Sequence, residues 1–248
     1  MAVVERLTSF GEAMERAKEL EAADKIRVST DGDHRLQVRG LDLRLPNGKL
    51  LLDEASFTVR PGETVSVGGP SGSGKTTLFR ALAGLWPFGK GEVSAPAGWR
   101  VLFLPQQPYL PIGTLRDALT YPDHPGAFDH ETCREVLEAC LLGHLSSRLG
   151  ETNNWSLALS VGEQQRLACA RALLLKPNWI FIDEGTSALD PAMEAHLYGL
   201  LRKRLPGAAI VSIAHRPEVT ALHDRHFTID PQRLALVEGT AERRLTPP

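Results

Sequence analysis

A glycine-rich segment at residues 69–76 constrains this chain more than any other feature. Its sequence, Gly69-Pro70-Ser71-Gly72-Ser73-Gly74-Lys75-Thr76, fits the pattern G-x-x-x-x-G-K-[ST] without a mismatch. Glycines lack a Cβ, so the backbone can wrap a phosphate with its N–H groups while the next helix directs its positive end there. The pattern needs a strand before it and a helix after it, and residues 64–67 and about 75–85 are predicted to supply them. An α/β protein that binds a phosphate group is therefore expected.

Three side chains at the end of this segment have expected roles in binding a nucleotide. Lys75 is expected to supply a cation to the β- and γ-phosphates, and the Thr76 hydroxyl to ligate Mg²⁺. Thr77 is expected to belong to the same site. The alternative is an ordinary glycine-rich turn at a strand–helix junction, which requires neither the lysine nor the threonine.

An acidic pair after an apolar run supports the nucleotide interpretation. Residues 179–182 are continuously apolar, as in a strand buried on both faces of a parallel sheet, and Asp183 and Glu184 follow them. Ligands of open α/β sheets bind at the carboxyl ends of such strands. Asp183 is expected to hold Mg²⁺, and Glu184 to polarise the water that attacks the γ-phosphate. Taken alone, such a pair is more often a solvated strand end, and the phosphate loop is what gives it weight.

The remaining pattern alternates strands with helices and predicts an α/β fold with a mainly parallel sheet. Apolar alternation on both sides of Asn47-Gly48 predicts a hairpin, so the N-terminal part is expected to form an antiparallel β subdomain. A mostly helical stretch is expected to form an inserted helical subdomain at about 110–170. The predicted strands are 36–45, 50–52, 56–59, 64–67, 101–104, 179–182, 208–213 and 227–229, and the predicted helices are 75–85, 114–174 (interrupted at 121–126) and 192–205.

Residues 1–25 have a different pattern, with a 4-3-4-3 apolar spacing filled by charged residues. The apolar positions are Val3, Leu7, Phe10, Met14 and Ala17. This spacing predicts an amphipathic helix with a narrow apolar stripe, which must pack against the following domain or another chain. The predicted domains are therefore a linker helix at 1–25 and an α/β domain at 26–248.

Composition and charge exclude several classes of protein. The chain has 28 Lys plus Arg and 30 Asp plus Glu, a net charge of −2, so no basic field supports a nucleic-acid partner. No run of 18 apolar residues predicts a membrane-spanning helix, and the N-terminus lacks a signal-peptide pattern. Cys133, Cys140 and Cys169 have neither a CxxC pair nor zinc-site spacing, and are expected to be buried in a reducing compartment.

A third motif identifies a family. Leu159-Ser160-Val161-Gly162-Glu163-Gln164-Gln165-Arg166 resembles the signature motif of ABC ATPases, which distinguishes them from other P-loop NTPases. Three more motifs follow the family's order: Gln106 matches the Q-loop glutamine, Ser187-Ala188-Leu189-Asp190 matches the D-loop, and His215 matches the switch histidine. With the phosphate loop and the acidic pair, these six motifs span about residues 30–230 and indicate an ABC-type P-loop NTPase core.

The resemblance implies a head-to-tail dimer of two copies of the chain, closed by ATP. Ser160 and Gly162 of one copy would contact the γ-phosphate bound at Lys75 of the other, and Asp190 would cross the interface. ATP and Mg²⁺ are the implied cofactors. From the residues alone, Ser160 and Gly162 also fit a plain helix N-cap, and such a helix start is itself an anion site.

Two further residues take catalytic roles by resemblance. His215 would stabilise γ-phosphate charge in the transition state, and Gln106 would sense Mg²⁺ and the attacking water. Considered singly, a lone histidine is more often structural or exposed, and a glutamine can be a plain surface amide.

Three stretches resemble a subgroup of fused half-transporters that includes peroxisomal acyl-chain transporters and bacterial peptide or vitamin B12 transporters. The stretches are 83–87, 104–111 and 113–117. The resemblance implies a transmembrane domain as partner, in the same full-length chain or a partner subunit, with residues 1–25 as its cytoplasmic tail. It also implies a location at the cytoplasmic face of a membrane, such as the bacterial inner membrane. The apolar loop 109–112 suits docking to that domain, with local core packing as the alternative.

One departure from the family concerns the base of the nucleotide. No Tyr, Phe or Trp lies between Arg27 and Glu54, where many relatives stack adenine, so adenine is expected to rest on Leu43 or Leu45. Weaker base selectivity, with comparable ATP and GTP hydrolysis, is the consequence.

Two functions other than transport remain. A soluble ABC ATPase of DNA repair or translation would usually carry a long coiled coil or two ATPase copies, and the sequence contains neither. A regulatory module that holds ATP without turnover would be indicated by the loss of Glu184 or His215, and both are present.

Overall fold

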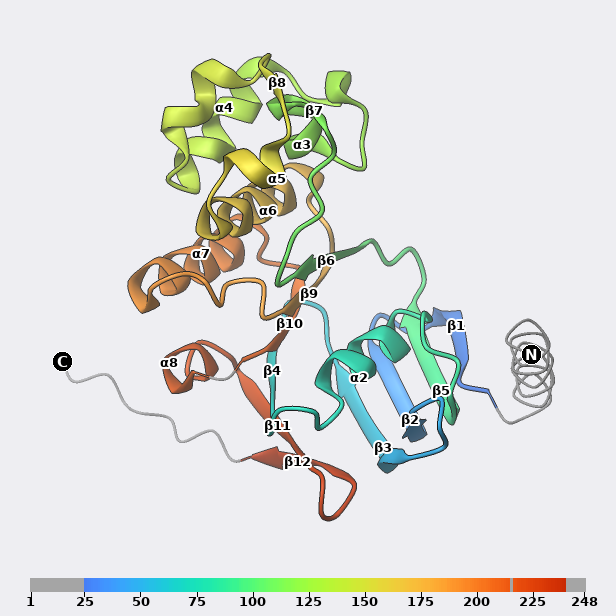
Figure 1. Ribbon diagram of the computed structural model, residues 1–248. Helices are drawn as coiled ribbons and strands as arrows, with labels where there is room; N and C mark the ends of the chain where they lie inside the picture. The colour runs from blue at the N-terminus through green and yellow to red at the C-terminus, as the bar shows by residue number, and fades with distance from the viewer. Residues whose placement is uncertain (1–24, 215, 240–248) are drawn as a thin grey trace, which may run out of the picture.

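The computed structural model describes residues 25–214 and 216–239, without the side chains of residues 31 and 32. The helix predicted at 1–25, except for Lys25, and the candidate His215 lie outside the described residues. Figure 1 shows a central sheet, a second sheet beside it at the N-terminal end, and a group of helices beyond the other end.

The central sheet has six strands in the order β12-β11-β4-β10-β9-β6. The strands from β11 to β6 pair in parallel, and β12 is antiparallel to β11 at one edge. β4 and β10 are buried along their whole length, as expected of apolar strands with both faces covered. The bounds are β4 (Thr64–Gly68), β6 (Val101–Pro105), β9 (Trp179–Asp183), β10 (Ala209–Ile213), β11 (Arg225–Asp230) and β12 (Ala235–Gly239).

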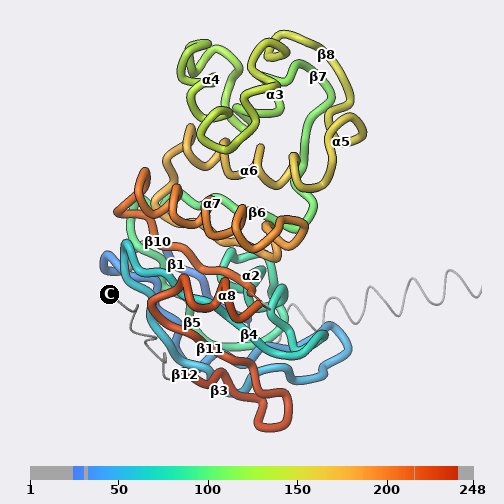
Figure 2. Tube along the Cα trace, turned by 90° about the vertical axis from the view of Figure 1, so that its left-hand side faces the viewer, coloured from blue at the N-terminus to red at the C-terminus, as the bar shows by residue number. Residues whose placement is uncertain are grey.

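The two faces of this sheet are covered by different helices. Ile180 and Ile182 of β9 belong to a core cluster that includes α6 (Val161–Leu175) and α7 (Pro191–Arg204). Trp179 and Phe181 point to the opposite face, in a cluster that includes α2 (Lys75–Leu82). Figure 2 shows α6 and α7 together on one side of β10 and α2 on the other. The predicted helix that follows the phosphate loop therefore lies across the sheet from the helix that follows the signature motif.

The N-terminal sheet has the order β1-β5-β2-β3 and shares its core with α2. β2 and β3 are antiparallel, and the predicted hairpin is closed by a hydrogen bond from Gly48 N to Leu45 O of 2.9 Å. β3 is one continuous strand where two short ones were predicted, and the sheet also contains β1, parallel to β5. The bounds are β1 (Arg27–Gly32), β2 (Leu36–Arg44), β3 (Leu50–Val59) and β5 (Gly89–Pro96).

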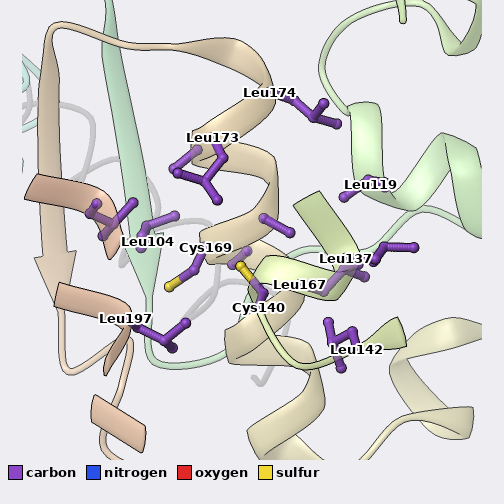
Figure 3. Close-up of a cluster of buried hydrophobic side chains, with 14 of the residues drawn as sticks. Leu104, Leu119, Leu137, Cys140, Leu142, Leu167, Cys169, Leu173, Leu174 and Leu197 are labelled. Atoms are coloured by element: carbon purple, nitrogen blue, oxygen red, sulfur yellow. The ribbon is translucent and has the colours of Figure 1, made fainter. Parts of the chain in front are cut away.

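The region predicted to be mostly helical consists of short helices that pack onto α6. Its elements are β7 (Gly113–Thr114), α3 (Leu115–Thr120), η1 (Pro125–Ala127), α4 (His130–Ala139), η2 (Gly143–Arg148), β8 (Thr152–Asn153) and α5 (Trp155–Ala158). The three cysteines are buried, as predicted, and Figure 3 shows Cys140 and Cys169 among leucines of β6, α4, α6 and α7. A short helix, α8 (Pro217–Thr220), follows β10.

Candidate nucleotide site

The loop between β4 and α2 has the backbone conformation that a phosphate cradle requires. Gly69, Gly72 and Gly74 have φ values of 136°, 73° and 100°, which favour glycine. Gly74 is the N-cap of α2, no side chain caps the helix, and its first turn contains no acidic residue. The first N–H groups of α2 are therefore left for an anion at the positive end of the helix.

Close packing around the loop also fits a bound phosphate chain. A Cβ at Gly69 would lie 2.9 Å from Ser73 Oγ, and a Cβ at Gly74 would lie 2.9 Å from Leu51 Cδ1. Ser73 Oγ is buried without a hydrogen-bond partner among the described residues. A buried hydroxyl of this kind is costly unless a ligand or water satisfies it, so the loop supplies an unused polar atom for a ligand.

Lys75 is held beneath the loop by the backbone. Its Nζ donates hydrogen bonds of 2.9 Å to the carbonyls of Gly69 and Pro70. Burial lowers the pKa of the Lys75 ammonium, whereas the carboxylates of Glu184 and Asp183 raise it. The predicted cation and the predicted acidic pair therefore lie within electrostatic reach of each other.

The end of β9 meets the start of α2 directly. Thr76 Oγ1 donates a 3.1 Å hydrogen bond to Asp183 Oδ1, across 107 residues of sequence. Burial raises the pKa of Asp183, and the Thr76 hydrogen bond opposes this shift. A hydroxyl and a carboxylate are hard oxygen ligands, and Mg²⁺ typically takes only one or two protein ligands together with phosphates. The pair fits such an ion. In residues 25–214 and 216–239, no group of three or more His, Cys, Asp or Glu side chains could hold a metal.

Glu184 has an unusual backbone conformation, with φ of 53°. This left-handed turn at the end of β9 directs the chain away from the sheet, while a β-bridge still links Glu184 to Pro105 at the end of β6. Glu184 also borders a cavity of about 50 Å³, large enough for a water molecule. The other lining residues are Thr186, Ser187, Glu194, Ile213, Ala214, Arg216 and Val219.

The loop at 184–190 is fixed by a guanidinium that the sequence analysis did not single out. Arg216 donates hydrogen bonds of 2.9 Å to Ser187 O and 2.6 Å to Leu189 O. Its Nη1 also lies 3.3 Å from Oε2 of Glu194, a buried carboxylate whose other oxygen accepts from Thr186. In the sequence, Arg216 stands out only as the residue next to His215, because the buried partners of a side chain are not visible in a single sequence.

Asp190 begins α7 as its N-cap. Its carboxylate accepts a 2.9 Å hydrogen bond from Met193 N, and the side chain is exposed. The residue therefore stands at the surface, where the resemblance expects it.

The signature segment lies at the start of α6. Ser160 is the N-cap, is exposed, and forms a capping box with Glu163, whose other carboxylate oxygen lies 3.0 Å from His144 Nε2. Gly162 follows in the first turn, packed near Leu189: a Cβ there would lie 3.4 Å from Leu189 Cδ2. Ser160 thus lies at the surface, while its hydroxyl and the Glu163 carboxylate cap the first turn of α6.

Within one chain the candidate residues form two groups. Gly69 to Thr77, Asp183 and Glu184 come together at the carboxyl ends of β4 and β9. Gln106 is exposed directly after β6, whose last residue pairs with Asp183. Ser160 and Gly162 start a helix on the opposite face of the sheet from α2.

The two leucines proposed to support adenine differ in their placement. Leu43 is fully buried in the core under the N-terminal sheet, so the expectation that it contacts a base is wrong. The alternation of β2 turns this side chain inward. Leu45 is partly exposed at the hairpin and keeps its candidate role.

The sequence itself matches one known family. The sequence model described as "ABC transporter" matches residues 52–187, more than half of the chain. The chain therefore belongs to the ABC transporter family, and it is an ATP-binding component of that class. Its relatives then relate it to the peroxisomal D sub-family and to YddA-type bacterial transporters.

Three relatives illustrate this relationship. An uncharacterized ABC transporter ATP-binding protein of Haemophilus influenzae is 37% identical over 223 residues, which cover 90% of this chain and 37% of the relative. The inner membrane ABC transporter ATP-binding protein YddA of Escherichia coli is 34% identical over 224 residues, covering 90% and 38%. Human ATP-binding cassette sub-family D member 3 is 35% identical over 208 residues, covering 80% and 31%. The chain thus spans about a third of the length of these relatives.

A solved structure has the same fold. A bacterial Atm1-family ABC exporter with ATP bound superimposes with a TM-score of 0.73 at 24% identity, covering 86% of this chain and 40% of the exporter chain. This likeness supports the predicted fold, a mainly parallel α/β core with an antiparallel subdomain. Across the described part of this chain, no helix is long and apolar enough to cross a membrane.

Proposed function

We propose that this chain hydrolyses ATP with Mg²⁺ and powers transport by a membrane domain that it contacts. The observation that carries the proposal is the Thr76–Asp183 hydrogen bond of 3.1 Å, which joins the phosphate loop to the acidic pair beside Lys75. This arrangement supports a site for a triphosphate with a divalent cation, and the presence of Glu184 next to Asp183 favours cleavage over binding alone.

The roles of the residues follow from their positions. The N–H groups from Gly69 to Thr77 bind the phosphates, and Lys75 neutralises the β- and γ-phosphate charge. Thr76 and Asp183 hold Mg²⁺, which supplies charge stabilisation to the phosphate oxygens when bound. Glu184 orients the attacking water, with Gln106 at the neighbouring strand end. His215 is assigned to γ-phosphate stabilisation from its motif.

A second copy of the chain completes the site in this proposal. The exposed Ser160 and the partly buried Gly162 lie on the opposite face of the sheet from α2, which begins at Lys75, so a single chain does not bring both groups to one triphosphate. In a head-to-tail pair, each Ser160 contacts the γ-phosphate held by the other copy's Lys75. Asp190, exposed at the start of α7, lies at the interface.

The partner and location follow from the relatives. YddA is named an inner membrane protein, and this chain matches about a third of such proteins. We assign residues 1–25 to the tail of a transmembrane domain and residues 26–248 to the ATPase domain, with its helical part at about 110–170. The domain then works at the cytoplasmic face of a membrane. Tyr109 and Ile112 are 61% and 77% exposed and supply an apolar docking surface, whereas Leu110 packs into the core.

Turnover and assembly test the proposal together. The wild-type chain is expected to release phosphate from ATP only with Mg²⁺, and Lys75→Ala to lose nucleotide binding. Glu184→Gln is expected to keep binding, lose turnover and accumulate an ATP-dependent dimer in sedimentation. Normal turnover by Glu184→Gln would remove Glu184 from its role. Binding without turnover in the wild type would instead favour a regulatory module.

The membrane partner has a separate test. The genomic sequence that precedes Met1, or a neighbouring gene, is expected to encode hydrophobic spans. If neither does, the transport assignment is wrong and a soluble ATPase of DNA repair or translation takes its place.

A further inference from the structure

Gln165 connects two loops of the site through the hydrogen bonds of its side-chain amide. It lies near the start of α6, five residues after Ser160, and it is 0% exposed. A fully buried amide must satisfy its donors and its acceptor within the protein. The partners of Gln165 are therefore part of what the residue does.

The donor end of Gln165 binds the segment that carries Gln106. Its Nε2 donates a 3.0 Å hydrogen bond to Gln106 O, across 59 residues of sequence. That segment directly follows Pro105, which pairs with Asp183 and forms a β-bridge with Glu184. One amide N–H of α6 thus fixes the backbone next to the two carboxylates.

The acceptor end of Gln165 binds the loop at 184–190. Ala188 N donates a 3.0 Å hydrogen bond to Gln165 Oε1. Arg216 holds the same loop from its carbonyl side, at Ser187 O and Leu189 O. The loop is therefore held from both sides, and the side-chain amide of Gln165 hydrogen-bonds both to this loop and to the Gln106 segment from its place on α6.

We propose that Gln165 is a positioning residue that sets Gln106 and Asp190 relative to α6. The planar amide keeps its two ends at a fixed separation, so a shift of α6 relative to the sheet must move both loops or break a buried hydrogen bond. Ser160 at the start of α6 then changes position together with Gln106 and Asp190. This inference rests on the proposed hydrolytic function, because it assigns a consequence for turnover to the contact.

Steady-state kinetics separate positioning from nucleotide binding. Gln165→Met keeps the length of the side chain and removes both hydrogen bonds. It is expected to lower kcat about tenfold, the effect of one or two lost buried hydrogen bonds, and to change the KM for ATP less than about twofold. An unchanged kcat in a folded variant, or a fall in kcat/KM that comes entirely from a higher KM, overturns the proposal.

A charge-changing variant provides a pH profile. Gln165→Glu keeps an acceptor for Ala188 N. When its carboxylate is ionised, however, it has no donor for Gln106 O, so a carboxylate oxygen faces a carbonyl oxygen there. Because burial and the facing carbonyl favour the neutral acid, protonation restores the donor. The ratio of variant to wild-type kcat is expected to rise several-fold from pH 8 to pH 6. A ratio that stays constant over this range contradicts a role for the Gln106 contact.

Hydrogen exchange decides the inference without reference to turnover. Gln165→Met is expected to speed hydrogen exchange at Ala188 N. The neighbouring Gln164 binds Ser156 O and Leu159 O through its side-chain amide, so Gln164→Met is expected to leave the exchange rate at Ala188 N unchanged. Equal exchange at Ala188 in both variants overturns the proposal. A wild-type chain that hydrolyses no ATP would refute the proposed function, and the exchange result would still test the contact.

Discussion

Removal of the Arg216 guanidinium is expected to destabilise the protein more than its exposure suggests. The side chain is 41% exposed, but its ion-pair partner Glu194 is only 5% exposed. Arg216→Met therefore leaves a buried carboxylate with only Thr186 as hydrogen-bond donor, and leaves Ser187 O and Leu189 O without the guanidinium. Breaking a fully buried pair costs about 3–5 kcal/mol. Water reaches the vacated site, so we expect a loss of about 2 kcal/mol, or about 4–8 °C in Tm.

A second arginine provides a matched control for this experiment. Arg202 is 46% exposed and binds one carbonyl, Leu222 O, where Arg216 binds two, and like Arg216 it pairs with one carboxylate, here Asp224, which is 45% exposed. Because the Asp224 carboxylate stays in contact with water, Arg202→Met is expected to cost at most about 1 kcal/mol. Urea unfolding of both variants measures the difference.

The pH dependence of the Arg216→Met effect identifies its cause. Burial already raises the pKa of Glu194 and Arg216 opposes that shift, so the variant raises the pKa further. A raised carboxyl pKa costs stability above the unfolded-state value and nothing below it. The loss is therefore expected to be largest near pH 7.5 and to shrink toward pH 4, and Glu194→Gln in the variant background should recover part of it. Equal losses for Arg216→Met and Arg202→Met, at every pH, would refute the reasoning.

Three further predictions concern a buried histidine, two buried cysteines and the hairpin proposed to support the base. Burial lowers the pKa of His223 to about 4 from its ordinary 6.5, so the folded protein binds this proton less readily and loses stability as pH falls through that interval. In His223→Gln, urea unfolding should show a smaller loss between pH 6.5 and pH 4, and an identical loss would contradict this. Burial raises the pKa of Cys140 to about 12 and that of Cys169 further, so Ellman's reagent at pH 8 should label neither thiol until urea is added. With Leu45 as the proposed support for the base, ATP and GTP should be hydrolysed at comparable rates. A strong ATP preference would indicate a different base contact, such as Trp86, whose indole donates a 2.8 Å hydrogen bond to Arg44 O beside Leu45.

The sequence predicts the parts of this fold that its local chemistry specifies. The phosphate loop, β9 and the Asn47-Gly48 hairpin each carry a pattern that one conformation satisfies, namely glycines at positive φ, a continuous apolar run and an Asn-Gly turn whose glycine has φ of 84°. These elements form as predicted because local and tertiary preferences agree there.

Other elements depend on partners that are distant in sequence. β5 contains two glycines, a serine and an alanine and shows little alternation, and pairing with β1 and β2 on its two sides makes it a strand. The same limit applies to the site. Gln165 and Arg216 are polar residues whose roles come from backbone groups 23 to 59 residues away, at Ala188, Ser187, Leu189 and Gln106. No spacing rule in the sequence connects them.

The position of β6 in the strand order separates a rigid part of the site from an adjustable one. β9, which ends in Asp183, has a neighbouring strand on each side, whereas β6, which leads to Gln106, pairs with β9 alone among the described strands. Displacing Asp183 would disrupt two ladders, and displacing the segment after β6 disrupts at most one. The Asp183 carboxylate is therefore anchored by strand pairing on both sides, whereas the segment with Gln106 is joined to the sheet from one side and depends on the Gln165 hydrogen bond for its position.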